Sequence, residues 1–320
     1  MAVLKEVTSV ASILLPIGES WRVNRCRYRS EDGAPGRLCL STGLHGDERM
    51  GQLVVYEIAQ RIQRQPDCLH GTVDIYPMLN PLGLDLSERT VPLGNRLDMN
   101  RAFPGSPDGT ALESVCHHII EDMRGADWAL DIHSSSQVTS EIYAVRVHAQ
   151  NAETMIAEAS ALCPEMIWVL PDKPAANATL TGALTQAGVR AAAVMVDERR
   201  LRAQRVTEQA VDGIFCKMKA MGLWTGETAL PPDADQIPCI RRPQDACRIT
   251  CTRPGMFVPV ERIGEEIAAG DTLGVIVDAL HGEPVETIVS PESGLLFAQR
   301  RYSVVYPGTL IAHLCRKERA

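Results

Sequence analysis

The chain has 320 residues, of which 45% are hydrophobic and 22% are charged, and its formal net charge is −8. This length can bury a full core and favours one large domain followed by a smaller one. The negative net charge disfavours nucleic acid as a partner, because phosphate contacts need a basic surface. No tract reaches the roughly 18 unbroken apolar residues of a membrane span, so no membrane partner is expected. The apolar run near the N-terminus has no small-residue cleavage site, which predicts a strand and a cytoplasmic protein.

Segments with strand-like and helix-like patterns alternate through the first two thirds of the chain. The predicted strands are 37–43, 71–79, 128–134, 141–147, 167–170 and 191–197. The predicted helices are 50–64, 111–123, a segment near 151–162, and 206–221. This alternation predicts an α/β fold around a mainly parallel or mixed sheet.

The composition changes after Trp224. Residues 225–238 are rich in Pro and Asp and are typical of a linker, and short strands separated by Gly and Pro follow. We therefore predict a large α/β domain over residues 1–228, which later motifs suggest is a zinc-dependent hydrolase domain, and a small all-β domain over residues 239–320. The second segment looks like a biotinyl/lipoyl-type barrel-sandwich module without the lysine that a carrier presents. That favours a structural role or a surface for a homo-oligomer.

The segment LHGDERMG (44–51) places His45 and Glu48 after a predicted strand and before a predicted helix. In open α/β sheets, ligands gather at this edge. An imidazole and a carboxylate three residues apart can reach one cation from a single turn. The alternative is an exposed histidine followed by a helix-capping glutamate.

A third ligand is offered by His133, which ends the apolar strand WALDIHS (128–134). Catalytic zinc commonly takes three protein ligands and one water, and two histidines with one glutamate form a known set. Asp131 lies on the same face of the strand, where it either orients His133 or caps the strand end. The pattern predicts one Zn²⁺ held by His45, Glu48 and His133.

The segment between these ligands, 88–105, is basic and punctuated by Pro and Gly. Asn100 and Arg101 together suit the recognition of a substrate carboxylate. Arg89 or Arg96 could polarise a scissile carbonyl and stabilise its oxyanion. An ordinary basic surface loop is the alternative, although long loops of this kind are often functional.

A general base is expected after the strand 191–197, which ends in Asp197 followed by Glu198. Either carboxylate could take a proton from water, and the longer side chain favours Glu198. The alternative is a surface salt bridge with Arg199 or Arg200.

The motifs HGDE (45–48), NR (100–101) and DIHS (131–134), followed by a strand that ends in an acid, resemble the succinylglutamate desuccinylase/aspartoacylase family, whose members are related to zinc carboxypeptidases. The resemblance covers residues 37 to 220, and the β-rich tail looks like that family's C-terminal domain. It implies a zinc-carboxypeptidase-like mixed sheet flanked by helices, with a C-terminal all-β barrel-sandwich domain.

The same resemblance implies zinc bound by His45, Glu48 and His133, and a substrate carboxylate bound by Asn100 and Arg101. It also implies an upstream arginine at the carbonyl. The family's base lies in Thr-x-Glu-x-Gly, whereas this chain reads Met195-Val196-Asp197-Glu198-Arg199, without the Thr and the following Gly.

The function expected from the sequence is a zinc-dependent deacylase. It would cleave the amide bond of a small, carboxylate-bearing N-acyl amino acid or a related N-acylated molecule. The alternatives are a metallocarboxypeptidase, or a metal-binding but catalytically weak family member that acts as a binding protein. The sequence leaves the acyl group and the amine open.

Overall fold

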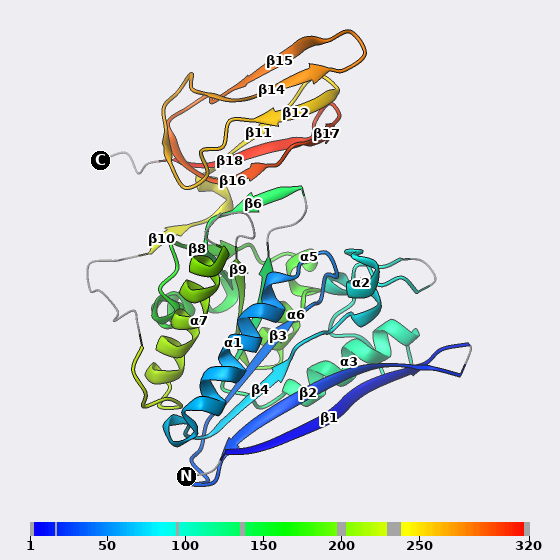
Figure 1. Cartoon of the computed structure of the whole chain (residues 1–320), viewed down its shortest axis with the longest axis vertical. Coiled ribbons are helices and arrows are strands. Elements are labelled where there is room, and N and C mark those ends of the chain that lie inside the picture. Colours follow the sequence, from blue (N-terminus) through cyan, green and yellow to red (C-terminus); the bar gives the residue numbers. More distant parts are fainter. Residues whose placement is uncertain are drawn as a thin grey trace.

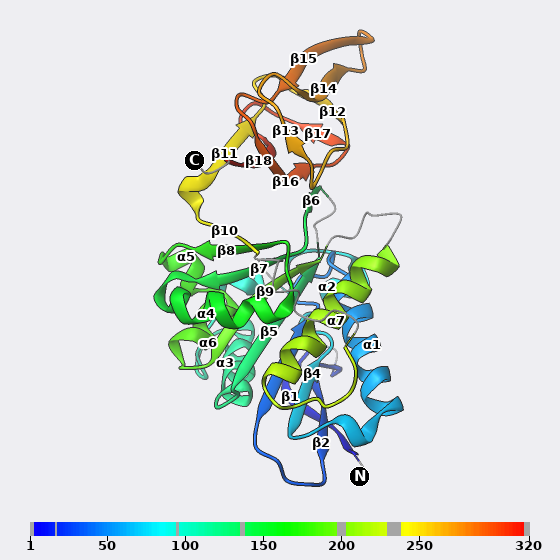
Figure 2. The ribbon, with the colours of Figure 1, turned by 90° about the vertical axis from the view of Figure 1, so that its left-hand side faces the viewer.

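The computed structural model describes residues 3–16, 18–93, 96–134, 138–196, 203–228 and 238–316. These residues form an elongated molecule in which an α/β body carries a smaller, strand-rich unit at one end (Figure 1). Rotating the molecule by 90° shows the two parts meeting near β6, β10 and β16 (Figure 2). We call residues 246–316 the β unit.

The body is built on a large mixed sheet. Within the described residues it has nine strands in the order β1-β2-β4-β3-β5-β9-β7-β8-β10. Their bounds are β1 Val3–Leu14, β2 Ser20–Ser30, β3 Arg37–Thr42, β4 Thr72–Tyr76, β5 Trp128–Ser134, β7 Ala144–His148, β8 Met166–Leu170, β9 Arg190–Val196 and β10 Cys239–Arg241. The central strands β4, β3, β5 and β9 run parallel, so their carboxyl ends share one edge of the sheet.

Helices cover both faces of this sheet. Their bounds are α1 Met50–Arg64, α2 Pro81–Leu86, α3 Ala111–Met123, α4 Ala152–Ala159, α5 Pro174–Asn177, α6 Leu180–Gln186 and α7 Ala203–Ala220. Short 3-10 turns are η1 Pro66–Cys68, η2 Met99–Arg101, η3 Ala149–Asn151, η4 Ser160–Leu162 and η5 Pro243–Asp245.

The large sheet has a hydrophobic core on each of its two faces, because side chains alternate between the faces along each strand. On β5, Leu130 and Ile132 join the core under α1, α4 and α7, whereas Ala129 joins the core under α3 and α6. Because successive side chains on a strand point to opposite faces, Asp131 and His133 share the face of Ala129. Near its carboxyl end, β5 therefore has apolar side chains on one face and the polar Asp131 and His133 on the other.

The β unit consists of antiparallel sheets that pack face to face. One sheet contains β11 Ala246–Thr250, β18 Leu310–Arg316, β16 Gly294–Arg300, β13 Glu266–Ile267 and the inserted β6 Thr139–Glu141. The other contains β15 Glu283–Val289, β14 Thr272–Asp278, β12 Gly255–Pro259 and β17 Ser303–Val305. Side chains such as Phe257, Ile276 and Leu296 fill the space between them.

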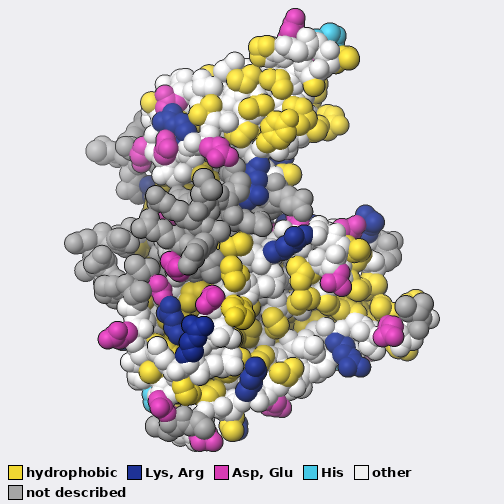
Figure 3. Space-filling model, in the orientation of Figure 1, with side chains coloured by type: hydrophobic (Ala, Val, Ile, Leu, Met, Phe, Trp, Pro, Cys, Tyr) yellow, Lys and Arg dark blue, Asp and Glu magenta, His cyan; other side chains and the backbone are white. Residues whose placement is uncertain are grey.

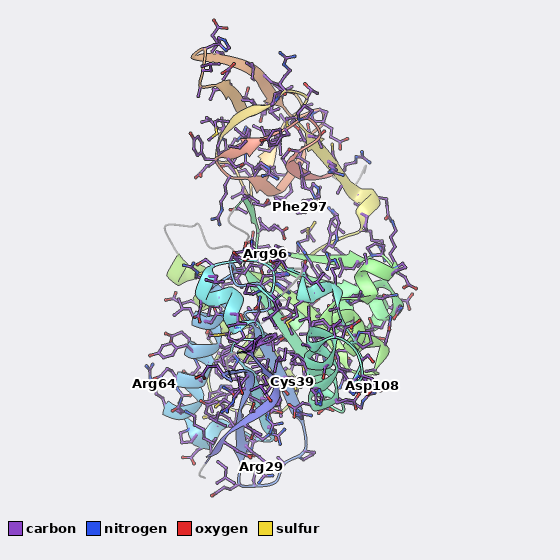
Figure 4. All side chains as sticks on the ribbon, turned by 90° about the vertical axis from the view of Figure 1, so that its right-hand side faces the viewer. Arg29, Cys39, Arg64, Arg96, Asp108 and Phe297 are labelled. Atoms are coloured by element: carbon purple, nitrogen blue, oxygen red, sulfur yellow. The ribbon has the colours of Figure 1, made fainter. Side chains whose placement is uncertain are left out.

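The body and the β unit are joined by strand pairing as well as by packing. Strand β6 belongs to the first half of the chain but pairs with β16 of the β unit. The ring centroids of Trp168 and Phe297 lie 5.3 Å apart across this junction. Figure 4 shows Phe297 where the two parts meet. In turn, β10 pairs with β8 of the body, although β10 begins at residue 239. Strand pairing therefore crosses the predicted boundary between residues 1–228 and 239–320. The division into these two domains stays a prediction.

The observed elements agree with the predicted fold class: a mixed α/β sheet flanked by helices, followed by antiparallel sheets. The bounds predicted for α1 and α3 coincide with those observed. At α3 the start is set by Thr110, whose hydroxyl accepts a hydrogen bond from the backbone N–H of Glu113 while the Glu113 carboxylate accepts from the N–H of Thr110. The strand expected at 141–147 is instead the end of β6 and a separate β7, because the chain changes sheets there.

Hydrophobic side chains gather on the exposed surface of the β unit over β12 and β17 (Figure 3). The exposed residues there include Val258, Tyr302, Val304 and Tyr306. The predicted self-association through this part of the chain stays a prediction. Among the described helices, none is long and apolar enough to cross a membrane.

A buried carboxylate links three neighbouring strands of the large sheet. Asp74 on β4 is fully buried and accepts hydrogen bonds from Nε of Arg27 at 2.7 Å and from Nε of Arg37 at 2.7 Å. Burial raises the pKa of Asp74, but the two guanidinium groups outweigh it and hold that pKa below its ordinary value. The three residues come from β4, β2 and β3, so the ion pairs link neighbouring strands.

We expect Asp74→Asn to lower the free energy of unfolding by about 3–5 kcal/mol, because it leaves two partly buried guanidinium groups without their counter-ion. Urea denaturation would measure the change. Asp108→Asn, which removes an exposed carboxylate, is the control and should change stability by less than about 0.5 kcal/mol. Equal effects of the two substitutions would contradict this account.

Candidate metal centre

The three predicted metal ligands converge in the fold. One ligand atom from each of His45, Glu48 and His133 lies within 4.8 Å of the others, and all three side chains are buried. His45 follows β3, Glu48 precedes α1, and His133 lies near the end of β5, which runs parallel to β3. The shared carboxyl edge of these strands brings the ligands together.

The loop that carries His45 and Glu48 passes very close to α2. A Cβ atom added at Gly46 would lie 2.0 Å from the carbonyl carbon of Gly83, so a side chain has no room there. The backbone N–H of Gly46 donates to the carbonyl oxygen of Glu88 at 3.0 Å. Glycine at this position lets the loop hold its two ligand side chains toward His133.

Glu48 connects the two histidines. Its Oε1 lies 2.8 Å from Nδ1 of His45, and its Oε2 accepts from Nδ1 of His133 at 2.8 Å. Burial raises the pKa of Glu48, but the adjacent His133 and His45 outweigh burial and hold that pKa well below its usual value. Burial lowers the pKa of His133, yet the carboxylates of Asp131 and Glu48 raise it to about 10. Without a metal, the group is therefore held together by opposite charges.

The far side of each imidazole also faces a carboxylate. Nε2 of His133 donates to Asp131 at 2.7 Å, and Nε2 of His45 donates to Asp98 at 3.1 Å. Ser41 in turn donates to Asp131 at 2.9 Å. Histidines that bind a metal commonly donate their other ring N–H to a carboxylate, which fixes the ring orientation. The donor set and its supporting carboxylates thus fit a divalent metal ion such as zinc.

Asp98 was not singled out by the sequence. It caps η2 by accepting from the backbone N–H of Asn100 at 2.9 Å, and it also contacts His45. Burial opposes its ionisation, but His45 and Arg89 lower its pKa to about 2. Its position two residues before Asn100 is a capping signal, whereas its contact with His45 depends on the folded loop.

Of the two candidate arginines, Arg89 lies in the site. Its Nη1 donates to Oε1 of Glu48 at 2.7 Å, and its side chain is 43% exposed. The Arg96 side chain is 69% exposed and faces Glu88 at 3.4 Å. Arg96 does not line the cavity described below, and Figure 4 shows it at the end of the body nearest the β unit.

Asn100 and Arg101 lie in η2, near the metal centre. The side-chain oxygen of Asn100 accepts from the backbone N–H of Leu180 at 2.9 Å, at the start of α6. Asn100 would therefore approach a ligand with its amide N–H groups. The Arg101 guanidinium donates to the Asn100 carbonyl oxygen at 2.6 Å. These bonds hold two groups of donors side by side, as carboxylate recognition requires.

A cavity of about 750 Å³ connects these residues. Its lining includes the three candidate ligands together with Arg89, Asn100 and Arg101. The β unit and its inserted strand also contribute, through Leu310 and Glu141. The size suits a small molecule whose polar groups meet fixed partners.

The predicted base Glu198 and its neighbour Asp197 lie outside the described residues, as do Arg199 and Arg200. Strand β9 is described to Val196, which pairs with Ser134 of β5. Ala193 and Met195 of β9 line the cavity. The assignment of a base therefore stays a prediction.

The fold is a mixed α/β sheet flanked by helices, and the His45, Glu48 and His133 group lies at the carboxyl edge of its central strands. The family described as "Succinylglutamate desuccinylase/Aspartoacylase catalytic domain" matches residues 35–206. The chain belongs to this family.

Three similar proteins match over most of the chain. The N-alpha-acetyl-L-2,4-diaminobutyric acid deacetylase of Halomonas elongata is 25% identical over 85% of this chain and 80% of its own. A succinylglutamate desuccinylase structure from Silicibacter sp. TM1040 is 20% identical, covers 99% of this chain and 96% of that one, and has a TM-score of 0.82. A product-bound structure of the ectoine utilization protein EutE (DoeB) from Ruegeria pomeroyi is 19% identical, with the same coverage and TM-score.

A more distant structure shares part of the fold. A metallo-carboxypeptidase from Burkholderia cenocepacia has a TM-score of 0.54 and 14% identity over 68% of this chain and 64% of that one. This likeness agrees with the predicted carboxypeptidase-like sheet.

We expect Gly46→Ala to lower the free energy of unfolding by about 1–3 kcal/mol, because the new methyl group must displace the Gly83 backbone. Thermal or urea denaturation would measure this change. In Gly125→Ala the added Cβ meets no atom within 4 Å, although φ is +76°. That variant therefore reports the backbone strain alone. A Gly46→Ala variant as stable as the unsubstituted protein would contradict the proposed collision.

Proposed function

We propose that the protein is a zinc-dependent deacylase that cleaves the amide bond of an N-acyl amino acid or a related N-acylated small molecule. The buried group of His45, Glu48 and His133, at a cavity that also contains Asn100 and Arg101, carries this proposal. Membership of the family and the deacetylase of Halomonas elongata support it.

His45, Glu48 and His133 would hold the zinc ion, and Asp131 and Asp98 would fix the orientation of the two imidazoles. When bound there, zinc supplies a Lewis acid and a water molecule of lowered pKa. Arg89, which contacts Glu48, would donate to the acyl carbonyl oxygen as negative charge develops on it.

Asn100 and Arg101 would bind the carboxylate of the substrate and so place its amide near the metal centre. Glu198 is proposed to take a proton from water and return it to the departing amine. The cavity is lined partly by Glu141 and Leu310, which favours a small molecule over a peptide chain that needs an open groove.

Zinc uptake by the metal-free protein should release at least one proton at pH 8, because Asp131 and Glu48 raise the pKa of His133 to about 10 and a protonated His133 must lose its proton to bind a metal. Calorimetric titration with Zn²⁺ in buffers of different ionisation enthalpy measures this release. The apparent affinity should rise with pH up to that value. If the heat of zinc binding did not depend on the buffer, the prediction that His133 is protonated in the metal-free protein would be contradicted.

The activity itself is tested by following amine release from N-acetyl and N-succinyl amino acids and from short peptides. We expect hydrolysis of at least one acyl amino acid by the zinc-loaded protein, and loss of activity by at least about 100-fold in His45→Ala. His118→Ala, which removes an exposed histidine of α3, is the matched control. Cleavage of the peptides alone would favour a metallocarboxypeptidase, and zinc binding without any hydrolysis would favour a binding protein.

A further inference from the structure

Two cysteines meet beside α7, and neither is among the residues that line the cavity. Cys163 follows the turn η4, and Cys216 lies within α7. Both carry free thiols, of which Cys163 is partly exposed and Cys216 is buried. The two side chains lie within hydrogen-bonding distance of each other. A buried thiol is thus in direct contact with one that small molecules in solvent can reach.

The backbone of α7 contacts the residue before Cys163. The hydroxyl of Tyr143 on β7 donates to the carbonyl oxygen of Leu162 at 3.0 Å. A Cβ atom added at Gly213 of α7 would lie 2.2 Å from that oxygen and 2.9 Å from the Tyr143 hydroxyl. Residues three apart lie on the same face of a helix, so Cys216 faces the end of η4 as Gly213 does. The absence of a side chain at Gly213 therefore lets α7 approach closely enough for the two thiols to meet.

The backbone at Cys163 is in the left-handed region, with φ of 51° and ψ of 46°. Among the described residues other than glycine, only Ser87 and Arg96 also have positive φ. This conformation is uncommon for a residue with a side chain and costs conformational free energy, which neighbouring contacts offset. At Cys163 those contacts include the thiol of Cys216. The turn thus holds the Cys163 side chain against α7.

Tyr143 is the third titratable group of this cluster. Burial raises the pKa of its hydroxyl, and the two thiols add to that rise. Burial likewise raises the pKa of the Cys163 thiol to about 11, and the adjacent Cys216 contributes to the rise. Cys163 is therefore protonated at neutral pH. Because the thiolate is the reactive form, Cys163 reacts slowly at neutral pH and faster as the pH rises.

The segment between the two cysteines builds one wall of the cavity, and we call residues 164–215 the cavity-wall segment. It contains β8, α5, α6 and β9, and also Glu198, the proposed base. Its residues that line the cavity include Lys173, Thr179 and Met195. A bond between the two sulfur atoms would close this segment into a loop. Such a crosslink restricts the unfolded chain more than the folded one.

We propose that Cys163 and Cys216 are a redox site, at which a small-molecule disulfide such as glutathione disulfide oxidises the two thiols to an intramolecular disulfide. The new bond links η4 to α7 and so fixes both ends of the cavity-wall segment. This inference does not depend on the deacylase function.

The chemistry is thiol–disulfide exchange in two steps. The Cys163 thiolate attacks one sulfur of glutathione disulfide, which breaks the S–S bond of the reagent and releases one glutathione thiolate. The Cys216 thiolate then attacks the Cys163 sulfur and displaces the second glutathione. Two cysteine thiols are oxidised, one glutathione disulfide is reduced, and the two cysteine protons pass to the two released thiolates.

The test treats the zinc-loaded full chain with glutathione disulfide under native conditions. The remaining thiols are then alkylated in denaturant, and the peptides are mapped by mass spectrometry. We expect a crosslink between the peptides that carry Cys163 and Cys216. The crosslinked protein should melt about 3 °C or more above the reduced protein, and dithiothreitol should reverse the shift.

Two single substitutions provide the matched comparison. Cys163→Ser should give neither the crosslink nor the rise in melting temperature. Cys68→Ser, which removes another partly buried thiol, should form the crosslink at a rate within about twofold of that of the original protein. In the original protein this rate should rise about tenfold per pH unit between pH 7 and pH 9, because the pKa of Cys163 lies above this range.

Alkylation of both cysteines after treatment with glutathione disulfide would overturn the proposal. A glutathione adduct that persists on Cys163 would also overturn it, because Cys216 would then be unable to reach the sulfur. A crosslink that leaves the melting temperature unchanged or lowers it would show that the bond does not fix the cavity-wall segment. A rate that levels off below pH 9 would overturn the assignment of Cys163 as the attacking thiol.

Discussion

The carboxylate of Glu48 is the interaction on which the site depends. One of its oxygens contacts His45, three residues before it in the sequence. The other contacts His133, 85 residues after it. It therefore joins the end of β3 to the end of β5 across the edge of the sheet. Because Glu48 and His133 are buried together, each favours the charged form of the other. A metal ion would replace this mutual attraction by coordination to the same atoms.

A second layer of acids supports the first. Asp131 and Asp98 face the outer nitrogens of the two imidazoles, so each ring lies between two carboxylates. This arrangement prevents rotation of the rings and keeps one nitrogen of each directed toward the metal centre. The precision of the site thus comes from Asp131 on β5 and from Asp98, the residue that caps the start of η2.

Much of the fold and the ligand group could be predicted from the sequence, because both follow local patterns. Apolar periodicity placed α1 and α3 at their observed bounds, and the strand-end positions of His45 and His133 indicated one sheet edge. Asp98 could not be predicted as a partner of His45, since that contact depends on how the loop folds. The choice between Arg89 and Arg96 could not be predicted for the same reason. Both arginines lie in one loop, and only tertiary packing directs one of the two side chains toward the site.

The pairing of β6 with β16 could not be predicted either, because a three-residue strand carries almost no periodic signal and its partner lies far along the chain. It has a consequence for synthesis of the protein. The ligand-bearing strands are complete at Ser134, but β16 begins only at Gly294. A chain emerging from the ribosome can form its sheet and its histidine group early, whereas the cavity wall must wait for the last strands. Immature chains would therefore have an open site, and only full-length chains would enclose a small molecule.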